Sequence, residues 1–165
     1  MKFSENWLRE LVNPALDSGE LAHVLTMAGH EVDDVRSAGA GLDSIVVAEV
    51  LSVSRHPDAD RLSVCQVSTG DGDPVEVVCG APNVVIGMKS PLASPGTRLP
   101  DGTKLRRSKI RGVVSNGMLC SSIELGLGDE ADGIIHLPDE ALTGSRLIDY
   151  LQLPDNVIDL DLTPN

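Results

Sequence analysis

The sequence predicts a mainly β chain in which a small barrel or sandwich is inserted into a small α+β unit. Short β-type runs follow one another from Ile45 to about residue 122, separated by clusters of Pro, Gly, Asp and Asn, and this spacing is typical of small barrels and sandwiches. Helical periodicity appears only on either side of these runs. We therefore predict a β domain at residues 40–140, with residues 1–39 and 141–165 forming one discontinuous α+β unit.

The first 35 residues predict two short helices and a strand. Ser4 is expected to cap the first helix, which ends before Pro14. The apolar face of this helix consists of Trp7, Leu8, Leu11 and Val12. Ser18 is expected to cap the second helix, which stops at Gly29. Residues 31–37 then read as a short strand.

The C-terminal segment, from about residue 133, predicts a mixture of helix and strand. Residues 133–138 suit a final edge strand of the β domain, and a helix is predicted to begin at Thr143 or Ser145. Apolar and acidic residues alternate over 157–162, which is the pattern of a half-buried strand. The chain stops at Asn165 directly after this strand, and we interpret that stop as a cut inside a longer protein.

The composition is that of a globular chain with a core poor in aromatic rings. Apolar residues make up 41% of the 165 residues, and charged residues make up 23%. The only aromatic residues are Phe3, Trp7 and Tyr150, all near the ends. The core between them is therefore expected to be aliphatic.

The three cysteines, Cys65, Cys79 and Cys120, suit neither a disulfide framework nor a zinc site. Their odd number and wide spacing argue against both. We expect buried free thiols, hence a reducing, cytoplasmic compartment. The N-terminus has no apolar signal region, and no apolar run approaches the length of a membrane span. No membrane partner is predicted.

Positive charge gathers in one part of an acidic chain. The formal net charge is −12, yet residues 55–112 carry nine Lys and Arg against six Asp and Glu. If residues 104–115 formed one strand, Arg107, Lys109 and Arg111 would share a face at intervals of about 6–7 Å. Such a ladder suits a nucleic-acid backbone. It is equally typical of a solvated edge strand that resists aggregation, and the charge pattern alone leaves both readings open.

The lack of aromatic side chains narrows the kind of nucleic acid that this ladder suits. Residues 8 to 149 contain no Phe, Trp or Tyr, whereas single-strand binders usually stack bases on such rings. Recognition is therefore expected to rely on phosphates, 2′-hydroxyls and folded shape. A structured RNA is favoured over a bare single strand.

Other candidate sites have ordinary structural explanations. His56, Asp58 and Asp60 are potential metal ligands, but the pattern is also plain turn chemistry, with Arg61 expected to pair with the aspartates. No nucleophile elbow, phosphate-binding loop or dinucleotide fingerprint is present. No catalytic or metal site is therefore predicted. The glycines of residues 115–128 fit either a hairpin bulge or a place where RNA meets backbone N–H groups.

Four segments between His56 and Pro138 stand in a familiar order, within a match that covers about residues 42–137. They are "HPDADRLSVCQVSTG", "VVCGAPNV", "KSPLASPGTRLPDGTKLRRSKIRGVVSNGMLCSSIELGLG" and "GIIHLP". Together they resemble the EMAP-II-type tRNA-binding OB domain, which implies an OB-fold barrel. By position in these motifs, the implied tRNA-binding residues are Asn83, Lys89, Lys104, Arg106, Arg107, Lys109, Arg111, Ser115, Asn116, Met118, Ser121 and Ser122. Val85 departs from the family pattern, because many members are polar or basic there.

The flanks carry a second resemblance. "MKFSENWLRELVNP" and "VIDLDLTPN" resemble the N-terminal unit of bacterial phenylalanyl-tRNA synthetase β subunits. This implies tRNA and the synthetase α subunit as partners, in an (αβ)2 heterotetramer, with no DNA or membrane partner. ATP and Mg2+ are implied for the full enzyme only. No cofactor, catalytic site or editing site is expected within residues 1–165.

Three other readings compete with a tRNA-binding module of a ligase. In the first, the flanks pack on the remainder of the ligase and the OB domain is an architectural spacer. In the second, the chain is a free-standing, chaperone-like tRNA-binding protein. The third is a metal-dependent enzyme, which a stoichiometric metal after purification would support.

Overall fold

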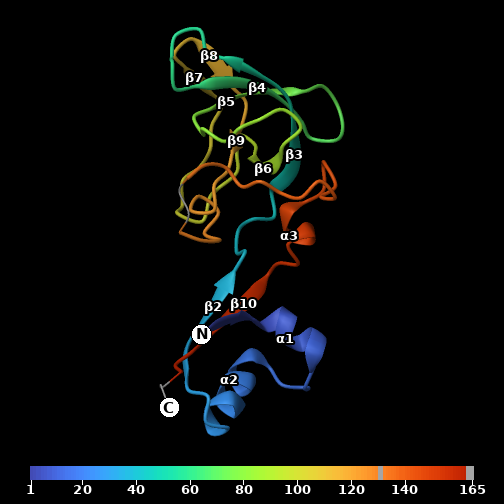
Figure 1. The fold of residues 1–165 in the computed structure, drawn as a ribbon, viewed down its shortest axis with the longest axis vertical. Coiled ribbons are helices and arrows are strands. Elements are labelled where there is room, and N and C mark those ends of the chain that lie inside the picture. The colour runs from blue at the N-terminus through green and yellow to red at the C-terminus, as the bar shows by residue number, and fades with distance from the viewer. Residues whose placement is uncertain (130–131, 163–165) are drawn as a thin grey trace. The chain divides into compact units, whose positions relative to one another are not determined.

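The computed structural model describes residues 1–129 and 132–162, and within it the chain divides into two compact units (Figure 1). Unit 1 contains residues 1–40 and the described residues from 152 onward, and unit 2 contains residues 41–151. Residues 163–165, which end the "LTPN" motif of the flank resemblance, lie outside the described residues.

Unit 1 is a three-stranded antiparallel sheet with two helices. The strand order is β1 (Lys2–Ser4), β10 (Asp155–Leu160), β2 (Val32–Ala38). The helices are α1 (Glu5–Leu11) and α2 (Ser18–Met27). Because β10 lies between β1 and β2, segments from before and after unit 2 form one sheet. Neither flank completes this sheet alone.

Local capping sets the helix ends of unit 1. The Ser4 side chain accepts a 3.0 Å hydrogen bond from an N–H in the first turn of α1, as predicted. The cap of α2 is Asp17 rather than the predicted Ser18. Asp17 and Glu20 form a reciprocal capping box, with backbone-to-carboxylate distances of 2.8 and 2.9 Å. Gly29, at φ +93°, ends α2 as predicted.

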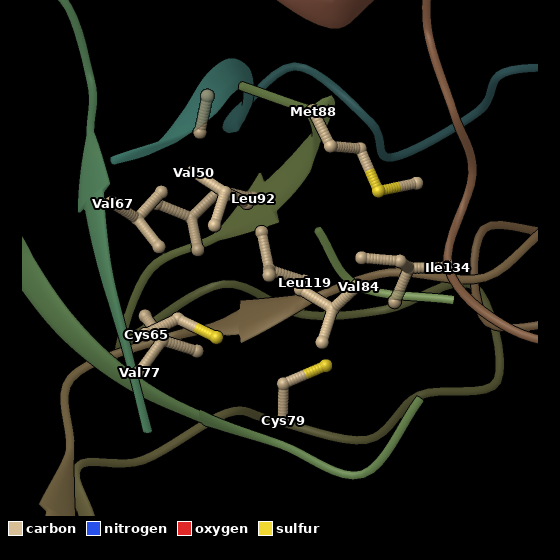
Figure 2. Packing of buried hydrophobic residues seen from close by; sticks show 11 residues of the cluster. Val50, Cys65, Val67, Val77, Cys79, Val84, Met88, Leu92, Leu119 and Ile134 are labelled. Atoms are coloured by element: carbon tan, nitrogen blue, oxygen red, sulfur yellow. The ribbon is translucent and has the colours of Figure 1, made fainter. Parts of the chain in front are cut away.

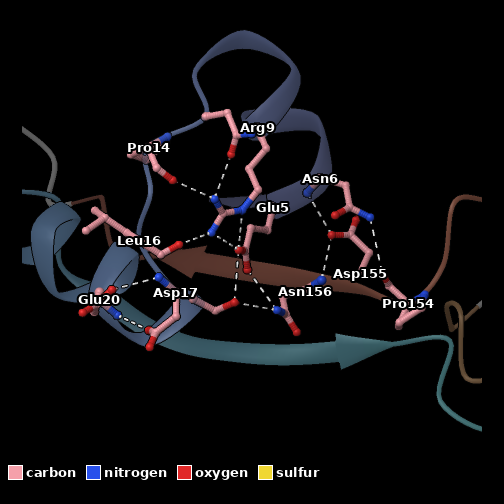
Figure 3. A network of polar contacts seen from close by, with 12 residues as sticks. Glu5, Asn6, Arg9, Pro14, Leu16, Asp17, Glu20, Pro154, Asp155 and Asn156 are labelled. Atoms are coloured by element: carbon pink, nitrogen blue, oxygen red, sulfur yellow. Dashed lines mark hydrogen bonds and ion pairs between the residues drawn. The ribbon is translucent and has the colours of Figure 1, made fainter.

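A buried carboxylate ties α1 to α2 and β10 within unit 1 (Figure 3). Glu5 is only 4% exposed. It accepts hydrogen bonds from Arg9 at 2.8 Å, from the Ser18 hydroxyl at 3.1 Å and from the Asn156 amide at 2.9 Å. The apolar core beside it is small and includes Leu21, Leu160 and the fully buried Ile158, to which Phe3, Leu8, Leu25 and Val32 are added at its edge.

Unit 2 is built on a five-stranded antiparallel sheet. Its order is β5 (Val75–Cys79), β4 (Ser63–Ser68), β3 (Ile45–Arg55), β6 (Lys89–Ala93), β9 (Met118–Leu119). The two edge strands β5 and β9 contact each other, so the sheet curls nearly into a closed barrel. The prediction of a mainly β fold with an OB-type barrel and an α+β flank is therefore confirmed.

The core of the barrel is aliphatic, as predicted from the distribution of aromatic residues. Figure 2 shows the side chains of this cluster converging between the strands. It consists of Ala48, Val50, Cys65, Val67, Val77, Cys79, Val84, Met88, Leu92, Leu119 and Ile134. Cys65, Cys79 and Cys120 are free and buried, which confirms the expected state of the thiols.

The basic segment forms a hairpin, which corrects the prediction of one continuous strand over 104–115. Strands β7 (Ser108–Ile110) and β8 (Val113–Ser115) pair antiparallel. Arg111 and Gly112 connect them, with φ of +44° and +96°. Positive φ at both central residues is the requirement of a type I′ turn, which joins two strands in two residues.

The segment after the barrel also differs from the prediction. Residues 141–151 belong to unit 2 and not to the flanking unit. The reason is backbone pairing with β3, since the Val47 N–H donates to the Ser145 carbonyl and the Gly144 N–H donates to the Val47 carbonyl, each at 2.8 Å. Helix α3 is short and spans Leu147–Tyr150.

Residues 133–138 were expected to be an edge strand, but they form no continuous strand in the structure. They make an isolated bridge to β6 through Leu137 and Lys89. Among the described residues, no helix is long and apolar enough to cross a membrane.

Candidate nucleic-acid interface

The basic loop and hairpin place free cations on the surface of unit 2. Lys104, Arg106 and Arg107 lie in the loop before β7, and Lys109 lies in β7. All four are exposed, and none forms an ion pair with a described residue. Their charges are therefore available to a polyanion.

The ladder of Arg107, Lys109 and Arg111 on one strand face does not form. Only Lys109 lies within β7, whereas Arg107 precedes it and Arg111 occupies the turn. The Arg111 guanidinium also points back to the "HPDAD" loop, where it donates to the Asp58 carbonyl at 3.4 Å. The cations form a cluster around the hairpin instead of a regular row.

The "HPDAD" loop is held by a buried histidine. His56 is 2% exposed, and its Nδ1 accepts the Asp58 N–H at 3.1 Å. Its Nε2 therefore carries the proton and donates to the Ile110 carbonyl of β7 at 3.0 Å. Asp60 pairs with Arg55 and not with the predicted Arg61. Within the described residues, no group of three or more His, Cys, Asp or Glu is placed to hold a metal ion.

Two of the implied tRNA-binding residues are used inside the protein. Asn83 exchanges two hydrogen bonds with the backbone of Ile134. The Lys89 ammonium donates to the carbonyls of Asp139 and Ala141, the latter at 2.8 Å. Both side chains fasten the segment after the barrel, so their contacts are structural.

The implied residues from β8 onward are buried or half-buried. Ser115 is 3% exposed, accepting the Val78 N–H and donating to the Gly117 carbonyl, each at 2.9 Å. Both hydrogen-bonding roles of its hydroxyl are thus filled by the protein. The other four are half-buried: Asn116, Met118, Ser121 and Ser122.

A cavity of about 440 Å³ opens beside the basic hairpin. Arg106, Met118 and Ser121 line it together with residues of β5, β7 and the loop after β5. Sequence reasoning missed its carboxylate, Glu124. The pattern Ser121-x-x-Glu124 is a capping box, and that motif predicts the local turn that places the carboxylate here.

The thiols near this cavity are not nucleophiles. Burial raises the pKa of Cys120 to about 12, and the negative charge of Glu124 adds to this. Burial also raises the pKa of Cys79, which lines the cavity. Both groups are neutral thiols near neutral pH.

Residues 45–146 match the model of a family described as a putative tRNA binding domain. The chain belongs to this family. The match includes the whole barrel, the basic hairpin and the cavity described above. Among solved structures, the C-terminal domain of Plasmodium vivax p43 is similar at 22% identity and a TM-score of 0.46, covering 62% of this chain and 57% of that one.

Comparison with curated proteins extends the similarity to all 165 residues. The chain is 54% identical to the phenylalanine–tRNA ligase beta subunit of Dechloromonas aromatica and 55% identical to that of Thiobacillus denitrificans. It is 50% identical to that of Acinetobacter baylyi. In each case it covers 21% of the relative, so the chain spans about a fifth of the length of these proteins and matches their N-terminal region.

Proposed function

We propose that this chain is the tRNA-binding N-terminal module of a phenylalanine–tRNA ligase β subunit. The observation that carries the proposal is the identity of 54% to such a subunit over the full chain. Membership of the tRNA-binding family over residues 45–146 supports the binding role. The free cations of the basic hairpin region supply the chemistry that such a role needs.

In the proposed assembly, the β subunit joins the α subunit in an (αβ)2 heterotetramer in the cytoplasm. This assembly would join phenylalanine to its tRNA with ATP and Mg2+. The chemistry would take place outside residues 1–165, and this module would hold tRNA without catalysing a step.

The binding mode follows from electrostatics. Lys104, Arg106, Arg107 and Lys109 would neutralise phosphates and release counterions, so affinity would fall steeply as salt is raised. The rest of the surface carries most of the chain's acidic residues, and the net charge of −12 repels a polyanion elsewhere. The tRNA would therefore be held by this one face of unit 2.

The proposal is tested by titrating the chain with tRNA at two salt concentrations. Changing Arg106, Arg107 and Lys109 together to Ala should weaken binding and reduce the slope of log affinity against log salt by up to about 2–3. The matched control removes three cations that pair with carboxylates elsewhere: Lys2, Arg36 and Arg146. Equal affinity of both triple variants would rule out the hairpin region as the site.

A second role concerns unit 1. Three apolar side chains on α1 and at its C-cap are exposed, with Trp7 at 58%, Leu11 at 72% and Val12 at 57%. This favours an additional architectural role, in which unit 1 packs on the α subunit or on the rest of the β subunit. Changing Trp7 and Leu11 to Ala should reduce capture of the α subunit without tRNA, whereas Leu142→Ala on unit 2, 73% exposed, should not.

A further inference from the structure

We propose that the cavity beside the basic hairpin receives a single unstacked nucleobase that carries an exocyclic amino group. The base would belong to the RNA whose phosphates lie on the neighbouring cations, so this inference rests on the proposed function. At about 440 Å³ the cavity falls within the range of small-molecule sites. Arg106 lines the cavity and is also one of the free cations around the hairpin. It therefore connects the cavity with the surface that would bind phosphates.

The walls of the cavity suit a flat ring without supplying an aromatic partner. Leu62, Pro82, Pro95 and Met118 present apolar faces to it. None of the three aromatic residues of the chain lines it. The guanidinium plane of Arg106 is the group at this site that can stack on a base, as arginine does in recognition of unstacked RNA bases.

Glu124 gives the cavity its selectivity. Its Oε2 accepts the Ser121 N–H at 2.7 Å and the Ser121 hydroxyl at 2.9 Å, which fixes the carboxylate. No described residue donates to its Oε1. An ionised carboxylate only accepts hydrogen bonds, so a ligand that satisfies Oε1 must present N–H or O–H donors.

This requirement separates the four RNA bases. Guanine, adenine and cytosine each carry an exocyclic NH2 group that can donate to a carboxylate. Uracil has no exocyclic amino group, and its one ring donor, N3–H, lies between two carbonyl oxygens that would face the negative charge of Glu124. The cavity should therefore accept the three amino-bearing bases and discriminate against uracil.

The test is an NMR titration of the amide spectrum of the chain with GMP, AMP, CMP and UMP. Saturable shifts of the Gly117, Met118 and Glu124 amides are expected with the first three nucleotides and about tenfold weaker binding with UMP. Glu124→Gln should weaken GMP binding about tenfold and remove the preference over UMP. Glu140→Gln, an exposed carboxylate outside the cavity, is the matched control.

A second variant keeps the test decisive if Glu124→Gln disturbs the local turn. Ala81→Phe would fill the cavity from its wall and should abolish the saturable shifts while the remaining spectrum keeps its dispersion. Equal binding of GMP and UMP, or wild-type GMP affinity in both variants, would overturn the inference.

Failure of this inference differs from failure of the proposed function. If tRNA binds with a steep salt dependence but no nucleotide shifts the cavity amides, the cavity is not a base-binding site, and the proposed tRNA-binding function is retained. If nucleotides bind but tRNA does not bind even at low salt, the assignment to an RNA base is overturned together with the proposed function.

Discussion

Asn83 and Ile134 exchange two hydrogen bonds across 51 positions of the chain. The Asn83 amide nitrogen donates to the Ile134 carbonyl at 2.8 Å, and the Ile134 N–H donates to Asn83 Oδ1 at 3.0 Å. Gly133 permits this approach, because a Cβ atom there would lie 2.2 Å from Asn83 Oδ1. The segment after the barrel is thus fastened by a side chain that the family resemblance suggests for tRNA contact.

Replacing Asn83 by Ala is expected to lower the free energy of unfolding of unit 2 by about 1–3 kcal/mol, because two hydrogen bonds are lost. Urea denaturation followed by circular dichroism measures this. Asn116→Ala is the control, since its amide makes only a long contact of 3.5 Å and should change stability less. Wild-type stability of Asn83→Ala would show that the Ile134 contacts contribute little.

Glu5 makes unit 1 sensitive to acid. Burial opposes its ionisation, but hydrogen bonds from Asn156, Ser18 and Arg9 outweigh this and lower the pKa of Glu5 below its ordinary value of 4.5. A carboxyl with a lowered pKa in the folded state contributes stability that is fully present above pH 4.5. That stability is lost as the pH falls below 4.5 and through the folded pKa.

Replacing Glu5 by Gln should remove this pH dependence and destabilise unit 1 by about 2–3 kcal/mol near neutral pH, because Arg9 loses its charged partner. Unfolding of unit 1 can be followed through Trp7, the only tryptophan in the chain. Glu10→Gln, on an exposed side chain of the same helix, is the control. If both variants lose the same stability between pH 7 and pH 3, the Glu5 network is not the acid-sensitive element.

Several features set by neighbouring residues were predictable from the sequence, whereas the features set by distant partners were not. The Ser4 cap, the stop at Gly29 and the alternation in the last strand depend on residues a few positions apart, and the structure has all three, although the strand ends at Leu160 and Leu162 is exposed. Asn83 and Ser115 look like surface polar residues in the sequence. Their partners lie 51 and 37 positions away, so only the fold shows that they are internal.

The buried serines Ser90 and Ser115 should respond to substitution in opposite directions. Ser90 is fully buried, and its hydroxyl has no hydrogen-bond partner among the described residues. Removing an unpaired buried polar group relieves its desolvation penalty, so Ser90→Ala should raise unfolding stability by about 1 kcal/mol. Ser115→Ala should lower it by about 1–3 kcal/mol, because two hydrogen bonds are lost. Thermal denaturation distinguishes the two, and a loss of stability in Ser90→Ala would contradict the prediction.

The three cysteine thiols should not react with thiol reagents in the native protein. Burial raises the pKa of Cys65 to about 11 and that of Cys120 to about 12, so almost no thiolate is present at pH 8. A thiol-reactive dye should give no colour with the folded chain over minutes and should report all three cysteines after addition of urea. Rapid reaction of one equivalent in the folded chain would place one thiol at the surface.

Arg111 should behave as a turn residue more than as a phosphate contact. At φ +44° it adopts a conformation that costs most side chains free energy, and Asn tolerates this conformation well. The Asn-Gly pair is a preferred type I′ turn, so Arg111→Asn should stabilise the β7–β8 hairpin by about 0.5–1 kcal/mol despite the lost contact to the Asp58 carbonyl. Gly112→Ala, at φ +96°, should destabilise it by about 1 kcal/mol or more.

Comparing Arg111→Asn with Lys109→Asn shows whether a cation contributes to RNA binding through its position or only through the net charge. Lys109→Asn removes one free cation from β7, and Arg111→Asn removes one cation that already points back to the protein. With the proposed site, tRNA affinity at low salt should fall more in Lys109→Asn than in Arg111→Asn, although each variant loses one positive charge. A larger loss in Arg111→Asn, with the hairpin intact by NMR, would instead make Arg111 a direct contact and return it to the phosphate-binding surface.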